Sequence, residues 1–233
     1  MLIGDIGLFV TSARSDARLA ALRHARKSSV TAFDRLYADA PQNDPWASSL
    51  PKYQYQRRKY EALARLIPAR PYRGALDLGC GLGLFTERLA ERAQQVLGID
   101  ISAVAISCAA DRSCALKNVR FRQGDIMALG SGLGCFDLVV VADALYYLPT
   151  PIQDETLEGV VARLAEMLAP DGIVLVANHY FPFPNPHTLL IHRIRRAFSR
   201  SPALTLLSEH WRPFFLTSVL VRTVVQGASE AAK

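Results

Sequence analysis

The chain has 233 residues, of which 50% are hydrophobic, and its formal net charge of +6 is unevenly spread: residues 76–184 carry 7 Lys and Arg against 13 Asp and Glu, while both flanks are basic. This length and apolar content fit one globular domain with a single large core. No apolar run approaches the roughly 20 residues of a membrane span, and the start, with acidic Asp5 and no basic stretch, is not that of a signal peptide, so we expect a cytoplasmic protein.

The first 72 residues are predicted to precede the main sheet. Residues 1–40 form an extension that is either helical, since residues 14–23 have apolar positions at helical spacing, or partly ordered. Residues 41–51 are a turn-rich linker that opens a domain running from 41 to 233. A helix is predicted over 52–67, because its apolar residues recur every three or four positions.

From residue 75 on, short apolar strands alternate with helical segments. This alternation predicts a doubly wound, Rossmann-like α/β fold: a seven-stranded, mainly parallel sheet with helices on both faces and a C-terminal antiparallel hairpin. Ser102 is the expected N-cap of the second of these helices. The predicted strands are 75–78, 96–99, 119–122, 137–141, 173–177, 204–208 and 214–222, and the predicted helices are 85–93, 102–112, 153–168 and 187–198.

The most distinctive segment is a glycine-rich run between the first strand and the following helix, Asp77-Leu78-Gly79-Cys80-Gly81-Leu82-Gly83. Glycines at alternate positions let the backbone approach a nucleoside closely, because no Cβ intervenes. Asp100 ends the next strand, where a carboxylate can hold two ribose hydroxyls. A dinucleotide site requires a third glycine five residues after the first, where this chain has Leu84. Asp77 beside the loop suits a cationic ligand instead.

These residues resemble the glycine loop and strand-end acid of the class I S-adenosylmethionine (SAM) methyltransferases. Gly124-Asp125-Ile126, the strand ending at Ala142-Asp143 and the turn at 168–172 agree with the same pattern, so the resemblance spans about residues 44–177. It implies SAM as methyl donor and S-adenosylhomocysteine (SAH) as product, with no metal. The cofactor-binding residues that it implies are Asp77, Gly79, Cys80, Gly81, Gly83, Asp100, Ile101, Asp125, Ile126 and Ala142.

The four cysteines are not expected to bind a metal. They lack the CxxC spacing of a zinc site, and a reducing compartment would leave them as thiols. Buried apolar packing is their expected role, and Cys80 stands inside the glycine loop, where a small side chain is required. The cysteines are Cys80, Cys108, Cys114 and Cys135.

A closer resemblance is to the nodulation protein S (NodS-like) methyltransferases, which N-methylate the amine of a glucosamine at one end of a chitin-type oligosaccharide. Asp44-Pro45-Trp46, Tyr55 with Arg57-Arg58-Lys59-Tyr60, and residues 144–148 carry it. Residues before the glycine loop commonly fold over the cofactor in this class, so 41–72 is expected to form a lid. Because residues 179–184 and 209–215 depart from that family, the glycan acceptor does not transfer to this chain.

Two side chains are predicted to act in catalysis. Methyl transfer from a sulfonium is an in-line displacement that positioning and exclusion of water can largely accelerate. An amine acceptor must also lose a proton, and His179, at the carboxyl edge of the sheet, is the candidate base with a pKa of about 6 to 7.5; a loop histidine with only a structural hydrogen bond is the alternative. Asp143 is predicted to orient an ammonium or hydroxyl. The acceptor-binding candidates are Trp46, Tyr55, Arg58, Tyr146, Tyr147 and His210.

The sequence therefore predicts a SAM-dependent methyltransferase that acts on an amine or hydroxyl of a small molecule, either a glycan, an anion or another natural-product intermediate, as a monomer or homodimer. An RNA methyltransferase is the alternative that the basic flanks favour. Enzymes that methylate exocyclic base amines, however, resemble one another in an Asn/Asp-Pro-Pro-Tyr/Phe segment where this chain has Asp143-Ala144-Leu145-Tyr146, so a nucleic-acid partner is not expected. A non-catalytic SAM-binding or protein-interaction module is the third alternative, and the filled cofactor positions argue against it.

Overall fold

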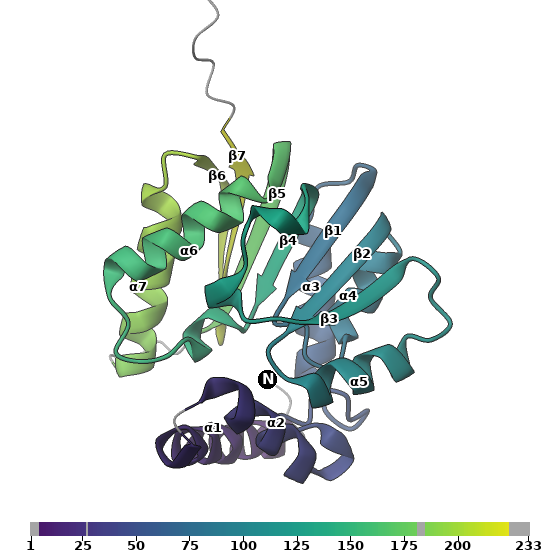
Figure 1. Ribbon diagram of the computed structural model, residues 1–233, viewed down its shortest axis with the longest axis vertical. Helices are drawn as coiled ribbons and strands as arrows, with labels where there is room; N and C mark the ends of the chain where they lie inside the picture. Colours follow the sequence, from purple (N-terminus) through teal and green to yellow (C-terminus); the bar gives the residue numbers. More distant parts are fainter. Residues whose placement is uncertain (1–4, 27, 181–184, 224–233) are drawn as a thin grey trace, which may run out of the picture.

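The computed structural model describes residues 5–26, 28–180 and 185–223, and a seven-stranded sheet forms its centre (Figure 1). The strands are β1 (Tyr72–Leu78), β2 (Ala93–Asp100), β3 (Val119–Gln123), β4 (Phe136–Ala142), β5 (Leu168–His179), β6 (Leu204–Arg212) and β7 (Phe215–Arg222). Their order across the sheet is β3-β2-β1-β4-β5-β7-β6, with β7 antiparallel to both of its neighbours and the other pairs parallel. The predicted α/β class, strand number and C-terminal antiparallel hairpin are confirmed.

Helices flank this sheet and also cross one of its ends. They are α1 (Ile6–Arg26), α2 (Ser29–Asp39), α3 (Tyr55–Leu66), α4 (Leu84–Ala90), α5 (Ala103–Arg112), α6 (Asp154–Glu166) and α7 (Pro186–Arg200). The predicted cap of α5 is present, because the Ser102 side chain accepts a hydrogen bond from the Ala105 backbone N–H at 3.2 Å. Several boundaries differ from the prediction: β1 and β2 each begin three residues earlier, and the helix predicted over 85–93 ends at Ala90. The predicted turn at 168–172 is a bulge inside β5, because Leu168 already pairs with Phe136 of β4.

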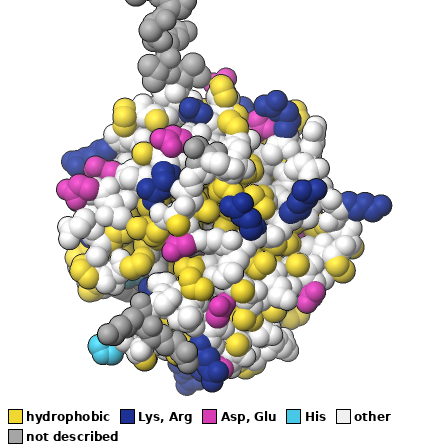
Figure 2. All heavy atoms as spheres, viewed as in Figure 1, with side chains coloured by type: hydrophobic (Ala, Val, Ile, Leu, Met, Phe, Trp, Pro, Cys, Tyr) yellow, Lys and Arg dark blue, Asp and Glu magenta, His cyan; other side chains and the backbone are white. Residues whose placement is uncertain are grey.

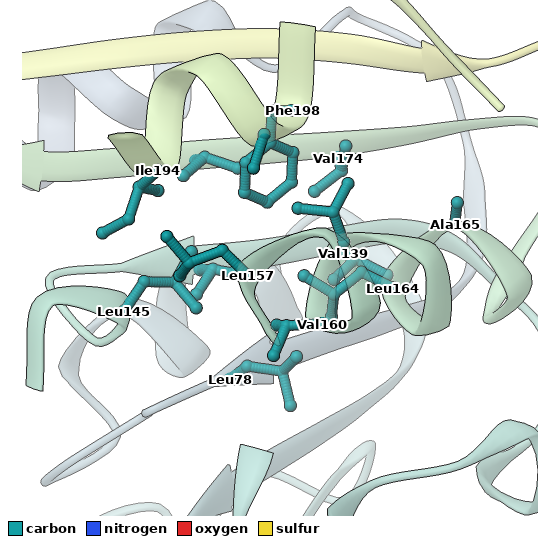
Figure 3. Close-up of a cluster of buried hydrophobic side chains, with 14 of the residues drawn as sticks. Leu78, Val139, Leu145, Leu157, Val160, Leu164, Ala165, Val174, Ile194 and Phe198 are labelled. Carbon is teal, nitrogen blue, oxygen red and sulfur yellow. The ribbon is translucent and has the colours of Figure 1, made fainter. Parts of the chain in front are cut away.

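The core has two layers, one on each face of the sheet. Along β4, Val139 and Val141 pack on α6 and α7, where they meet Val160 and Phe198 (Figure 3). Leu138 and Val140 point to the opposite face, onto α3 and α4. Strands buried on both faces read as continuous apolar runs, which explains why this sheet was predictable from sequence.

The N-terminal helices α1 and α2 lie together across one end of the sheet, at the bottom of Figure 1. Leu19 of α1 and Phe33 and Leu36 of α2 pack with Leu82 of the glycine loop and Ala105 of α5. The segment predicted as a helical or partly ordered extension thus contains two helices that share one hydrophobic cluster with the glycine loop. In the described ranges, no helix is both long and apolar enough to cross a membrane.

The surface drawn in Figure 2 mixes charges of both signs. Lys and Arg side chains are scattered on it, with acidic and hydrophobic side chains between them. A protein that tracks a nucleic-acid backbone usually gathers its basic residues on one face or along one helix. This face of the molecule has no such arrangement.

Candidate active site

A cavity of about 930 Å³ lies where β1, β2, β4 and β5 end, between these strand ends and the helices α1 and α2. In open α/β sheets, ligands bind at this edge because the loops after parallel strands converge there. The cofactor side of the cavity is lined by the loops after β1, β2 and β3, at residues 79–82, 100–101 and 124–126. The acceptor side is lined by residues at and after the ends of β4 and β5, namely 142–144, 146–149 and His179, together with parts of α1 and α3.

The glycine loop forms a cradle that larger residues would fill. Gly79 and Gly81 have φ values of 73° and 52°, in the left-handed region that favours glycine. A Cβ at Gly79 would stand 2.4 Å from the Ala144 Cβ, and one at Gly81 would stand 3.1 Å from the Tyr37 hydroxyl. Gly83, also left-handed at 76°, is the N-cap of α4 and lies outside the cavity lining. Packing against Ala144 and Tyr37, together with the left-handed backbone, therefore requires glycine at positions 79 and 81, and both line the cavity.

Asp100 both supports this cradle and lines the cavity. Its Oδ2 accepts a hydrogen bond from the Gly81 N–H, and its Oδ1 accepts one from the Ser102 N–H, each at 2.9 Å. Burial raises the pKa of the Asp100 carboxyl, although these backbone hydrogen bonds act in the opposite direction. The carboxylate is thus held in one orientation at the end of β2, as a ribose-binding acid requires.

The remaining cofactor candidates mostly share this lining. Asp125 is oriented by the Met127 N–H, which donates to its Oδ1 at 2.9 Å. The thiol of Cys80 is buried, and burial raises its pKa well above the ordinary value. Cys80 therefore stays protonated and contributes to packing, since only a thiolate would act as a nucleophile. The predicted residues that line the cavity are Gly79, Cys80, Gly81, Asp100, Ile101, Asp125, Ile126 and Ala142.

Asp77 takes a different position from the one predicted for it. It is buried behind the loop, outside the cavity lining, and its Oδ2 accepts a hydrogen bond from the Thr86 hydroxyl at 2.6 Å. Burial raises the pKa of Asp77 to about 7, and the hydrogen bond from Thr86 only partly offsets this effect. Asp77 therefore acts on a ligand only through its charge and through the loop that it supports.

This buried acid makes stability depend on pH. The folded chain holds the Asp77 proton up to about pH 7, whereas the unfolded chain loses it near 3.8, so the free energy of unfolding falls as pH rises between these values. The loss from pH 5 to pH 8 is about 3 kcal/mol for this group. We expect Asp77→Asn to remove that part of the decline in urea unfolding at the two pH values. Asp111→Asn, at an exposed position on α5, should leave the decline as in the wild type; an equal decline in the Asp77 variant would contradict the assignment.

Three ionisable side chains meet on the acceptor side. The Lys59 side chain of α3 is fully buried, and its ammonium donates to Oδ2 of Asp143, just after β4. The other carboxylate oxygen of Asp143 lies 3.9 Å from Nδ1 of His179 at the end of β5. Although burial acts to raise the pKa of Asp143, Lys59 and His179 lower it below its ordinary value. Asp143 is therefore an ionised, paired carboxylate beside the histidine.

His179 is less basic than the sequence predicted. Burial, followed by the positive charge of Lys59, lowers its pKa to about 4, and the opposing effect of Asp143 is smaller. The predicted range of 6 to 7.5 is the one that suits a general base near neutral pH, and it is wrong for this residue. His179 is instead neutral at physiological pH, so it is able to accept a proton but is a weak base.

The N-terminal helices are fastened over the cavity. Oδ1 of Asp16 on α1 accepts a hydrogen bond from Trp46 Nε1 at 3.1 Å and another from the Tyr147 hydroxyl at 2.8 Å. Arg23 of the same helix donates to the Tyr147 carbonyl oxygen. Trp46, Tyr146 and Tyr147, which were predicted to bind the acceptor, line the cavity and also join this cover to the turn after β4. The helices α1 and α2 thus lie over the cavity together with part of the predicted lid, residues 41–72.

If this cover must move for ligand exchange, then loosening it should speed ligand release. We expect Asp16→Ala, which removes two hydrogen bonds, to raise the SAH dissociation rate roughly threefold to tenfold. Stopped-flow fluorescence of Trp46 would measure the rate. Arg14→Ala changes an exposed residue on the same helix and serves as the control. An unchanged rate in Asp16→Ala would mean that the cover does not gate release.

Two predicted acceptor residues are not brought to the cavity. Arg58 is exposed on α3, and His210 lies within β6 opposite Thr217, away from the lining residues. On α3, Lys59 stands four residues before buried Leu63 and therefore shares the face of the helix that packs on the sheet. Arg58, one residue earlier, points away from that face and from the cavity. The four-residue spacing between Lys59 and Leu63 is the feature of the sequence that could have identified Lys59 as an inward-facing residue. Of the segment 179–184 that departs from NodS-like sequences, residues 181–184 lie outside the described structure.

Tyr55 lines the acceptor side of the cavity, where its hydroxyl donates to the Phe214 carbonyl oxygen at 3.3 Å.

Across the part of the chain that the structure covers, no group of His, Cys, Asp and Glu side chains has a metal-binding arrangement.

Comparisons with known proteins agree with this geometry. Residues 75–172 match a family model described as a methyltransferase domain. The chain is 43% identical over 122 residues to trans-aconitate 2-methyltransferase of Deinococcus radiodurans, which covers 50% of this chain and 43% of that protein. It is 30% identical over 148 residues to nodulation protein S of Sinorhizobium fredii, covering 64% and 66% of the two chains. The match thus spans less than two thirds of each of these relatives.

Among solved structures, the N-methyltransferase NodS of Bradyrhizobium japonicum WM9 in complex with SAH has the same fold, with a TM-score of 0.65 and 22% identity over 83% of this chain and 97% of that one. Together with the glycine loop and its strand-end acid, these matches show that residues 75–172 contain a methyltransferase domain with the fold of the solved N-methyltransferase. The sequence is similar to nodulation protein S in particular, at 30–31% identity to three such proteins over 58–64% of this chain. The resemblance read from the sequence is confirmed.

Proposed function

We propose that this chain transfers the methyl group of SAM to a hydroxyl or amine of a small molecule. One observation carries the proposal: a single cavity joins the glycine cradle and Asp100 to the buried group Lys59, Asp143 and His179. Its volume of about 930 Å³ is near the upper end of the range for small-molecule sites, which suits a cofactor and an acceptor bound together.

The residues present fit the cofactor. Gly79 and Gly81 leave bare backbone at the cavity wall, which supports a nucleoside site there, with Asp100 to accept hydrogen bonds from its ribose. When bound, SAM supplies a methyl group on a positively charged sulfur, open to in-line attack. Asp125, held by the Met127 N–H, is placed to receive the amino group of the adenine.

The acceptor-side residues then have three tasks. His179, neutral and half-buried, accepts the proton that the acceptor loses. Asp143 orients the attacking group and is itself held by Lys59, which acts as a positioning residue. The helices α1 and α2 exclude water from the cavity, as methyl transfer requires if water is not to compete.

Transfer of labelled methyl groups from SAM would test this proposal. We would incubate the full chain with labelled SAM and separate pools of small hydroxylated compounds, amines, chitin oligosaccharides and RNA. The proposal expects label in a small-molecule pool and none in RNA. Label found only in RNA, or SAH binding without transfer to any pool, would contradict it and favour one of the other two classes.

A further inference from the structure

Aromatic rings from four separate segments surround the acceptor side of the cavity. The ring of Phe9 on α1 lies 5.3 Å from that of Tyr55, 5.4 Å from that of Phe214 and 6.2 Å from that of His179, and the Tyr55 and His179 rings are 5.8 Å apart. All four residues line the cavity. We call Phe9, Tyr55 and Phe214 the ring cluster. Rings at these separations form favourable tilted and edge-on contacts and offer the same contacts to another ring.

Phe214 reaches this cluster from a strained turn. It lies between β6 and β7 with a φ of 73°, in the left-handed region that bulky residues rarely adopt. Such conformations cost free energy and concentrate at binding sites. Here the strained residue is one that presents its ring to the cavity.

The cavity also has an apolar entrance. Ile6, Phe9, Val10 and Ala13 of α1 line it at helical spacing, so one apolar stripe of this helix faces the ligand space. Ile6 and Val10 remain 51% and 45% exposed. Apolar residues that line a cavity and are also exposed to solvent lie at its opening. An apolar ligand bound at this opening would remove Ile6 and Val10 from contact with water.

The charges beside the ring cluster are balanced. Lys59 and Asp143 form one buried pair, and His179 is neutral at physiological pH. The burial and the Lys59 charge that disfavour an imidazolium here would also disfavour an alkylammonium. A hydroxyl enters such a site without a charge and meets His179 as a proton acceptor.

Resting on the proposed function, we infer that the methyl acceptor is an uncharged aromatic hydroxyl compound, bound with its ring in the ring cluster and its hydroxyl beside Asp143 and His179. This differs from a glucosamine amine, which is polar throughout and cationic at neutral pH.

Binding measurements on the full chain saturated with SAH would test the inference without turnover. We would titrate 4-ethylphenol, its saturated analogue 4-ethylcyclohexanol, 2-phenylethylamine and a glucosamine dimer by calorimetry. The phenol should bind most tightly of the four. Equal binding of the saturated ring, or tighter binding of either amine, would overturn the inference.

Variants of Phe9 locate the site. Phe9→Leu keeps an apolar side chain without the ring, so it should weaken phenol binding about twofold to tenfold and leave SAH binding unchanged. Leu189→Ala, at an exposed position on α7, is the control. A loss confined to SAM, with phenol binding kept, would assign the ring cluster to the sulfonium and overturn the inference.

The two proposals fail in different ways. If SAH does not bind the wild-type chain, the proposed function itself fails. If SAH binds and labelled methyl groups reach a glycan or an alkylamine but no phenol, then only the inference about the acceptor fails.

Discussion

Asp100→Ala is expected to weaken SAM binding by about 2 to 4 kcal/mol, because a buried carboxylate that would accept two hydrogen bonds from the ribose is lost. This corresponds to a roughly 30- to 1000-fold increase in Kd. The effect should lie at the upper end of this range, since Asp100 also holds Gly81 and Ser102 and its removal loosens the cradle. Calorimetry with SAM and with SAH measures the change.

Two further variants separate the roles of Asp100. Asp100→Asn keeps one oxygen acceptor and should lose less affinity than the alanine variant. Asp111→Ala, an exposed acid on the next helix, should bind SAM like the wild type. A folded Asp100→Ala protein with unchanged affinity would remove this residue from the cofactor site.

His179→Ala is expected to lower turnover about 100- to 10,000-fold while SAM affinity is kept, if this residue takes the acceptor proton. Because its pKa is about 4, the neutral form is already fully populated at pH 6, so protonation of His179 should cause no rise in the wild-type rate between pH 6 and 8. The measurement is turnover at saturating SAM across this range. A loss of only about tenfold would indicate catalysis by positioning, and Asp143→Asn would then be the more damaging change.

Lys59→Met tests the positioning residue separately from the base. Removing the buried ammonium should raise the pKa of His179 above about 4 but only part of the way to its ordinary value, because burial is the larger cause and remains in the variant. NMR titration of His179 reads the same pKa without turnover. A His179 pKa that stays near 4 in this variant would mean that burial alone sets it.

The sequence predicted the sheet and the cofactor side of the cavity well, because both depend on local signals. Continuous apolar strands, a capped helix and glycines at alternate positions each specify their own geometry. Asp100 was identifiable because it is an acidic residue at the carboxyl end of a parallel strand, the edge where ligands bind in this fold. The Ser102 cap followed from the same local pattern.

The acceptor side was harder to predict because it is assembled from distant segments. Phe9, Tyr55 and Phe214 are separated by up to about 200 positions in the chain, and no local periodicity brings them together. Choosing Arg58 instead of Lys59 was an error of one residue in helical phase. The low pKa of His179 depends on burial and on Lys59, neither of which is visible from the residues around position 179.

The contact between Gly79 and Ala144 has a thermodynamic consequence. Because a methyl group at Gly79 would stand 2.4 Å from the Ala144 Cβ, a ligand that moves the glycine loop toward Ala144 would also displace the turn that holds Asp143. The free energies of binding donor and acceptor are then coupled, and reciprocity requires that each ligand change the affinity of the other by the same factor. The order in which the two ligands bind would therefore be set by their rates, with the same ternary complex reached by either route.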